Sequence, residues 1–129
     1  IWESMMGLQF ENLVLNNLKK LCEILRIDIS EISNAGPFFQ RKTQRMKGCQ
    51  IDLLIQTKHN TLYVCEIKFS SSEVKSSIIE EMEKKIENLS IPKGVSVRPV
   101  LIHVNGVSQL IIESEVFNDI VDFSQFFNI

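Results

Sequence analysis

The sequence predicts an α/β domain in which helices flank a central sheet, and three observations lead to this expectation. Apolar residues recur at helical spacing in two segments, residues 4–26 and 74–89. Apolar runs of strand-like composition lie between these segments and after the second one. The 129 residues are 44% hydrophobic and 23% charged, with only 5 Gly and 3 Pro, a composition that supplies one buried core and excludes a disordered chain.

The first predicted helix covers residues 4–26. Its apolar positions recur every three or four residues and are Phe10, Leu13, Val14, Leu18, Leu21, Cys22 and Leu25. The pattern fades at residues 26–28, and Ala35-Gly36-Pro37 then marks a break in regular structure. Residues 38–44 fit either an extended arm or a weak first strand.

Two strong strand signals come next, at residues 50–56 and 62–69, and the short polar segment 58–60 between them predicts a hairpin. Serines 70–72 and Glu73 offer N-caps for a second helix that reaches about Asn88. A buried strand is expected at residues 95–104, then an Asn105-Gly106 turn, a short strand around residues 116–121 and a closing helical turn at residues 123–127. Counting the weak strand, the predicted order is α-β-β-β-α-β.

The charge balance leaves room only for a local nucleic-acid site. The chain carries 14 Lys and Arg against 16 Asp and Glu, so its net charge of −2 gives no overall attraction to DNA or to an acidic membrane. Residues 34–51, however, contain four basic residues and no acidic one. These residues, Arg41, Lys42, Arg45 and Lys47, fit either a phosphate-contacting segment or an ordinary solvated loop.

Cysteine usage and hydropathy predict a cytoplasmic chain without a membrane partner. The three cysteines are widely spaced, which favours a reducing compartment over a zinc site or a disulfide framework. Apolar stretches fall well short of the ~20 residues that a membrane span needs. Because the chain begins with Ile1 and has no signal-peptide pattern, we expect a piece of a longer protein, with processing as the alternative.

Four charged residues interrupt otherwise apolar elements. Glu11 falls on the apolar stripe of the first helix close to Leu18, where an unpaired carboxylate is costly, so it either has a partner or reaches solvent at the edge of the stripe. Asp52 lies in one apolar strand, and Glu66 and Lys68 share one face of the next. Such residues are rarely buried unless they are paired or bind a metal, and a structural ion pair is the alternative to a functional site.

These residues together resemble the PD-(D/E)XK nuclease superfamily. The resemblance is carried by residues 7–11 (GLQFE), 50–52 (QID) and 66–68 (EIK), with Ile51 at the commonly relaxed position of the Pro. It implies the restriction-endonuclease-like α-β-β-β-α-β core, a central mixed sheet flanked by helices. The G-x-x-F-E start, QIDLLI and CEIKFS look more specifically like the C-terminal nuclease-like domain of prokaryotic AAA-type ATPases. Residues 1–129 would then be one domain, cut from a larger ATPase.

The resemblance also implies a metal-dependent nuclease acting on DNA, or less expectedly on RNA. Asp52 and Glu66 would bind Mg²⁺ or Mn²⁺, the carbonyl of Ile67 would add a ligand, and Glu11 would bind through a water or complete a second metal site. Lys68 would orient or help deprotonate the attacking water and stabilise the developing charge. The alternative is a non-catalytic, nucleic-acid-binding or regulatory module. The implied partners are DNA and the N-terminal ATPase domain of the same chain; the oligomeric state is left open.

Two geometric expectations follow for the hairpin. Asp52 and Glu66 converge only if they lie opposite each other, which requires Thr57 to face Thr61 across a three-residue loop with Asn60 in the left-handed conformation. A two-residue loop would shift the register by one and place Glu66 on the other face of the sheet.

The helices carry two further expectations. We expect the Glu11 carboxylate within one water's reach of the Asp52–Glu66 pair, or bonded to Lys68, with a surface position as the alternative. On the second helix, Lys84 and Lys85 either point into the cleft or form ordinary i,i+4 pairs with Glu80 and Glu81, and we favour the latter.

Overall fold

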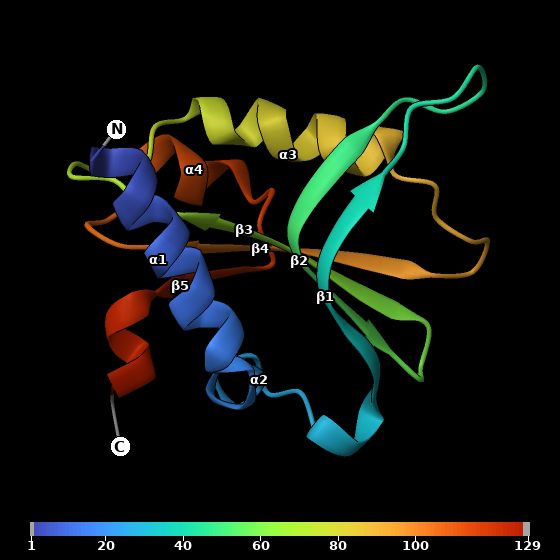
Figure 1. Ribbon diagram of the computed structural model, residues 1–129, viewed down its shortest axis with the longest axis horizontal. Helices are drawn as coiled ribbons and strands as arrows, with labels where there is room; N and C mark the ends of the chain where they lie inside the picture. Colours follow the sequence, from blue (N-terminus) through green and yellow to red (C-terminus); the bar gives the residue numbers. More distant parts are fainter. Residues whose placement is uncertain (1, 128–129) are drawn as a thin grey trace.

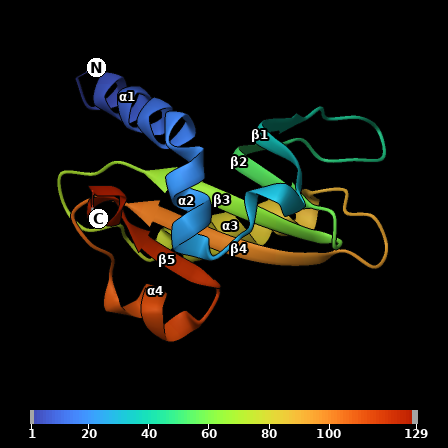
Figure 2. The same ribbon diagram turned by 90° about the horizontal axis from the view of Figure 1, so that it is seen from below.

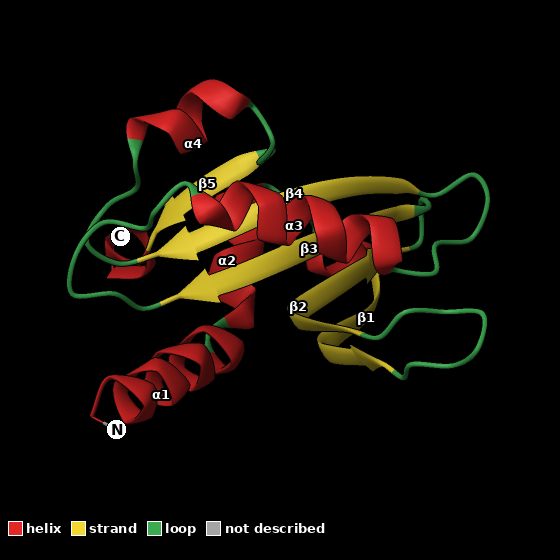
Figure 3. Ribbon diagram, turned by 90° about the horizontal axis from the view of Figure 1, so that it is seen from above, coloured by secondary structure: helices red, strands yellow, loops and turns green. Residues whose placement is uncertain are grey.

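The computed structural model describes residues 2–127, apart from the side chains of residues 2–6 and 10. Within these residues the elements are α1 (Trp2–Asn16), α2 (Leu18–Leu25), η1 (Ile29–Glu31), β1 (Ile32–Gln40), β2 (Cys49–Thr57), β3 (Thr61–Lys68), α3 (Ser77–Asn88), β4 (Ser96–His103), α4 (Gln109–Ser114), β5 (Asp119–Asp122) and η2 (Phe123–Phe127). The strands form one sheet in the order β1-β2-β3-β4-β5, with helices on both of its faces (Figures 1 and 3). The predicted α/β class is confirmed.

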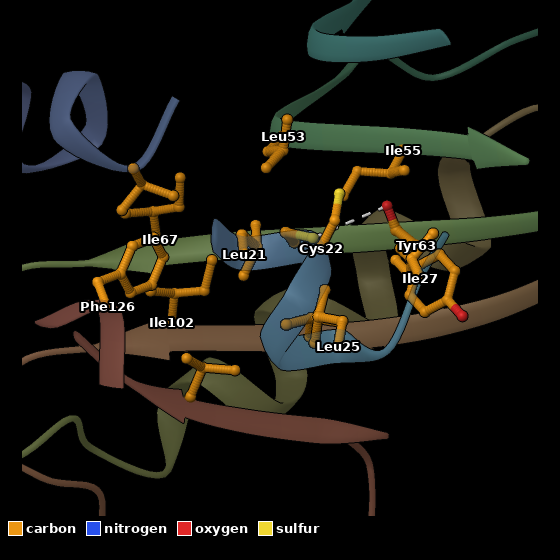
Figure 4. Packing of buried hydrophobic residues seen from close by; sticks show 14 residues of the cluster. Leu21, Cys22, Leu25, Ile27, Leu53, Ile55, Tyr63, Ile67, Ile102 and Phe126 are labelled. Atoms are coloured by element: carbon orange, nitrogen blue, oxygen red, sulfur yellow. Dashed lines mark hydrogen bonds between the residues drawn. The ribbon is translucent and has the colours of Figure 1, made fainter. Parts of the chain in front are cut away.

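The sheet is mixed, because β1, β2 and β3 are antiparallel whereas β3, β4 and β5 are parallel. One apolar cluster lies between the sheet and α1, α2 and η2, and a second lies between the sheet and α3 and α4. Figure 4 shows the first cluster, in which Leu21, Cys22 and Leu25 of α2 pack over the strands. Residues 62–67 of β3 are buried on both faces, so β3 is the centre of the fold.

The predicted helix over residues 4–26 is interrupted, and the expectation of one continuous helix is wrong. Asn17 leaves the helical conformation (φ −113°, ψ 33°), and its side-chain amide donates a 2.7 Å hydrogen bond to the carbonyl of Leu13. This local bond competes with helix continuation, and α1 and α2 run in different directions (Figure 2). Of the predicted apolar stripe, Val14 is fully buried but Leu13 is 49% exposed. Phe10, predicted to belong to the same stripe, lies outside the described side chains.

The weak first strand exists, but it begins earlier than predicted. Gly36 and Pro37 lie inside β1 rather than at its boundary, because β1 is an edge strand and a proline is tolerated there. The pairing with β2 also shifts register between Gly36 and Phe38, where the regular ladder of hydrogen bonds is interrupted.

Gln40, the last residue of β1, fastens this strand to the end of α3. Its side chain is buried and donates 2.6 and 2.7 Å hydrogen bonds to the carbonyls of Asn88 and Lys47. Its carbonyl oxygen accepts a 2.8 Å bond from the N–H of Ser90. One amide therefore holds both ends of the basic loop against the helix.

The hairpin has the predicted register. Leu53 pairs with Cys65, and the pairing continues toward the turn, where the N–H of Thr61 donates to Oγ1 of Thr57 at 3.3 Å. Asn60 has a φ of 59°, the left-handed conformation that the three-residue loop requires. The expectation that the loop aligns Asp52 with Glu66 is thus supported at every pair that the ladder forms.

The second half of the chain differs from prediction mainly in its connections. The predicted strand at residues 95–104 is confirmed as β4, and β5 and η2 confirm the short strand and the closing turn. The helix α3, however, begins only at Ser77, because the preceding segment forms a bridge between Val74 and Val107. The helix α4 was not predicted; it begins where the hydroxyl of Ser108 accepts from the N–H of Leu110. In the described part of the chain, the helices lack the length and apolar character needed to cross a membrane.

Candidate active site

The site forms where β2 and β3 separate. Their backbone pairing ends at Leu53 and Cys65, one residue short of Asp52 and Glu66. At this point Oδ2 of Asp52 accepts a 2.8 Å hydrogen bond from the N–H of Ile67. A side-chain carboxylate therefore takes the place of a backbone acceptor and fixes Asp52 in the opening between the two strands.

A β-bulge in β2 gives Asp52 this position. Gly36 pairs with Leu54 and Phe38 pairs with Ile51, so β2 has one more residue than β1 over this stretch. The bulge breaks the alternation of side chains, because Ile51 joins the α3 cluster whereas Leu53 joins the α2 cluster. Bulges of this kind re-aim a side chain, and here the residue between the two is Asp52.

Glu66 is the most deeply buried charged residue in the described part of the chain. Its side chain is 1% exposed and its Oε1 forms an ion pair with Nζ of Lys85, yet among the described residues neither of its oxygens has a hydrogen bond of regular geometry. Burial, followed by the neighbouring Asp52 carboxylate, raises the pKa of Glu66 to about 8, although Lys85 acts in the opposite direction. Such a carboxylate is available to an additional cation.

Glu11 approaches the same position from α1. It lines a groove together with Asp52, and its pKa is raised first by burial and then by the charge of Asp52 and a hydrogen bond with it. The positive charges of Lys68 and Lys85 lower the pKa in part. Glu11 therefore lies beside Asp52, as expected, and its side chain is half-buried rather than free in solvent. Its role at the metal stays a prediction.

The two lysines of the site form ion pairs between β3 and α3, each with a glutamate on the other element. Nζ of Lys68 on β3 lies 3.8 Å from Oε1 of Glu81 on α3, and Lys85 on α3 pairs with Glu66 on β3. The expectation that Lys85 forms an i,i+4 pair with Glu81 is therefore wrong, because Glu81 pairs with Lys68 and Lys85 pairs with Glu66. The helix α3 lies across the face that carries Glu66, where a buried carboxylate attracts a lysine more strongly than an exposed glutamate does.

The Ile67 backbone faces the same opening. Because the N–H and C=O of one strand residue point toward the same neighbouring strand, the Ile67 carbonyl is directed to the side on which its N–H binds Asp52. The prediction that this carbonyl serves a metal stays a prediction.

The oxygen donors of the site match the preferences of a hard divalent cation only in part. In the part of the chain that the structure describes, three or more His, Cys, Asp or Glu side chains are nowhere arranged to hold a metal ion. Mg²⁺, however, commonly takes only one or two protein carboxylates and keeps several waters. Asp52 uses one oxygen for the Ile67 N–H, and Glu66 lacks regular hydrogen bonds, so unused carboxylate oxygens are present and the set fits Mg²⁺ or Mn²⁺.

The basic residues of the predicted nucleic-acid segment are placed apart from the carboxylates. Residues 41–48 form the loop between β1 and β2, which extends beyond the body of the domain (Figure 1). Arg41, Lys42, Arg45 and Lys47 are all exposed on it. The structure thus brings Glu11, Asp52, Glu66 and Lys68 together and leaves the basic residues on a projecting arm.

The expected partner of Lys85, Glu81, is wrong, although the helical pattern of α3 already indicated that Lys85 faces the core. Ile78 and Met82 are the buried residues of α3, and Lys85 follows Met82 by three positions, on the same face of the helix. A lysine on that face needs an acidic partner in the core. Gln40 was missed entirely, since an amide at a strand end carries no comparable pattern.

Comparisons with known proteins support the architecture. A crystal structure of a repair endonuclease from Pyrococcus abyssi matches with a TM-score of 0.54 and 16% sequence identity, over 87% of this chain and 44% of that chain. This chain has the restriction-endonuclease-like fold. The structure of an EndoMS-dsDNA2 complex has a TM-score of 0.46 and 16% identity, over 81% of this chain and 43% of that one.

The likeness is one of fold, because the sequences differ in most positions. The chain spans less than half the length of either of these structures. Neither a family model nor a curated protein matches the sequence.

Proposed function

We propose that this chain is a metal-dependent nuclease domain that hydrolyses phosphodiester bonds of DNA. The observation that carries the proposal is Glu66, a buried carboxylate without regular hydrogen bonds, beside Asp52 at the opening between β2 and β3. Lys68 follows Glu66 by two residues and lies on the same face of β3. The fold shared with a repair endonuclease supports this assignment.

Each residue has a role in this proposal. Asp52 and Glu66 would hold the Mg²⁺ or Mn²⁺, the Ile67 carbonyl would add a further ligand, and Glu11 would bind through a water or at a second site. When bound, the ion neutralises charge on the scissile phosphate and makes a water more acidic. Lys68 orients the attacking water, helps to remove its proton and stabilises the negative charge that develops on the phosphate.

The proposal extends to the context of the domain. The G-x-x-F-E, QIDLLI and CEIKFS segments support its attachment to an N-terminal AAA-type ATPase domain. Three free cysteines support a cytoplasmic location, because thiols stay reduced there.

The second candidate function is a non-catalytic module that binds nucleic acid or regulates the ATPase. The ion pair between Lys85 and Glu66 favours it, because a lysine already neutralises the carboxylate that the metal needs. Measurements of DNA cleavage and of metal binding distinguish the nuclease from the regulatory module.

Incubating the chain with plasmid and single-stranded DNA tests the nuclease. We expect cleavage in Mg²⁺ or Mn²⁺ and loss of cleavage in EDTA. Asp52→Asn keeps the size of the side chain but removes its charge, so it should abolish both cleavage and the rise in melting temperature on adding metal. A wild-type chain that binds metal yet cleaves neither substrate would leave the regulatory candidate standing.

The basic loop should supply affinity rather than chemistry. Replacing Arg41 and Arg45 by Gln should weaken DNA binding and flatten its salt dependence by up to about two units of log–log slope, since each lost phosphate contact accounts for roughly 0.9. Replacing the exposed Lys19 and Lys93 by Gln removes the same charge elsewhere and is the matched control. Equal effects of both pairs in a fluorescence-anisotropy titration would assign the binding to net charge alone.

A further inference from the structure

A groove between α1 and β1 leads to the candidate active site and has a distinctive lining. We name it the α1–β1 groove and define it by Leu8, Glu11 and Asn12 of α1, Phe38 and Phe39 of β1, and Asp52 of β2. Its volume is about 200 Å³, below the roughly 300–1,000 Å³ of pockets that enclose drug-sized ligands. The groove has room for one small planar ring, with two acidic residues of the site in its wall.

The rim of the groove is unusually apolar. Phe39 is 69% exposed and Leu8 is 64% exposed. Burying a phenylalanine stabilises a fold by about 1.5–3 kcal/mol, and Phe39 largely forgoes this stabilisation. Phe38 also lines a second pocket beside Leu54 and Leu62 and is only 37% exposed, so Phe39 offers the larger free ring surface at the groove.

The surrounding charge identifies the kind of occupant. Glu11 and Asp52 alone would repel a phosphate chain, but the loop that begins two residues after Phe39 carries Arg41, Lys42, Arg45 and Lys47 without an acidic residue. A strand of nucleic acid matches both features, because its phosphates are attracted to the loop and its bases present π faces to a ring. A purely apolar protein segment would have no use for the four cations.

We propose that the α1–β1 groove binds one unstacked base of a single nucleic-acid strand, with that base stacked on Phe39 and the adjoining backbone directed toward Asp52. This inference rests on the proposed nuclease function and names its substrate class. Bases inside a regular duplex are stacked on their neighbours, so only single-stranded or locally opened nucleic acid presents a free face to Phe39. The groove then selects substrate before the carboxylates act.

The test measures binding separately from cleavage. A fluorescent single-stranded oligonucleotide and its duplex are titrated with the 129-residue chain in EDTA, followed by anisotropy. We expect the single strand to bind more tightly than the duplex. Phe39→Leu, which keeps an apolar side chain but removes the π face, should weaken single-strand binding by at least about fivefold. Phe39→Trp should retain it.

Phe127 supplies a matched control, because it is 72% exposed and lies on η2, after the opposite edge strand of the sheet. Phe127→Leu should leave binding unchanged. Equal binding of single strand and duplex, or equal effects of Phe39→Leu and Phe127→Leu, would overturn the inference, whereas metal-dependent cleavage of plasmid would still uphold the nuclease. Binding of neither oligonucleotide would also overturn it.

Discussion

Lys68→Ala should lower the rate of DNA cleavage by about 10²–10³-fold, the loss that follows when one preorganised group is removed from a developing charge. Lys68 lies on the same face of β3 as Glu66, two residues away, and its ammonium group is held 3.8 Å from Glu81 of α3. If Lys68 serves the reaction, its charge matters to the phosphate and not only to Glu81. Initial rates at saturating metal measure the effect.

The same ion pair supplies the control for this prediction. Glu81→Ala breaks the pair from the other side, and both side chains are substantially exposed, at 36% and 51%. Such a pair contributes only about 0–1 kcal/mol to stability, so the two variants should unfold at similar temperatures. Cleavage by Glu81→Ala should stay within a few-fold of wild type. An equal loss of rate in both variants would make the pair structural and remove Lys68 from the reaction.

The predictions that hold are those fixed by local stereochemistry. The hairpin register follows from a three-residue loop, a favourable Thr57–Thr61 pair and an asparagine that tolerates a positive φ. Each of these depends on residues within five positions of one another. The apolar runs of β3 and of the second half of β4 are equally explicit, because strand segments covered on both faces are mainly apolar.

The predictions that fail involve a choice between local and distant partners. Asn17 sits in a segment with helical periodicity, but its amide caps the carbonyl of Leu13 and ends α1. Lys85 has an acidic residue four positions before it and nevertheless pairs with Glu66 across the core. Gln40 joins two elements that are 48 residues apart in the chain, from the strand end to Asn88. Periodicity does not encode such long-range hydrogen bonds.

The sequence predicts the candidate site only in part. Its acidic residues stand out because they interrupt apolar strands, and the structure brings Glu11, Asp52 and Glu66 together. The bulge that sets the position of Asp52 was not foreseen, since a β-bulge becomes visible only when both strands and their pairing are known. The sequence therefore predicts which residues meet better than it predicts the backbone that makes them meet.

In metal-free buffer the protein should become less stable as the pH rises from about 6.5 to 8, and Glu66→Gln should remove most of this loss. Burial raises the pKa of Glu66 from 4.5 to about 8, so across this range the folded chain holds a proton that the unfolded chain has released. A group of this kind stabilises fully below its unfolded pKa, and its contribution is lost as the pH rises through the folded pKa. The slope approaches about 1.4 kcal/mol per pH unit for one proton.

The pH window is chosen to isolate Glu66. Burial lowers the pKa of His103 from 6.5, which makes stability rise with pH below that value, and the lowered pKa of Asp122 acts at still more acidic pH. The raised pKa of Glu11 has the same sign as that of Glu66, so a small slope should survive in Glu66→Gln. Urea unfolding at pH 6.5, 7.2 and 8 measures the difference. Adding Mg²⁺ should reverse the trend in wild type, because a metal binds the deprotonated carboxylates and gains affinity as the pH rises. A wild-type profile that is flat in EDTA would show that Lys85 keeps Glu66 charged across this range. A decline in stability that Mg²⁺ leaves unchanged would show that the Lys85–Glu66 pair belongs to the core rather than to a metal site.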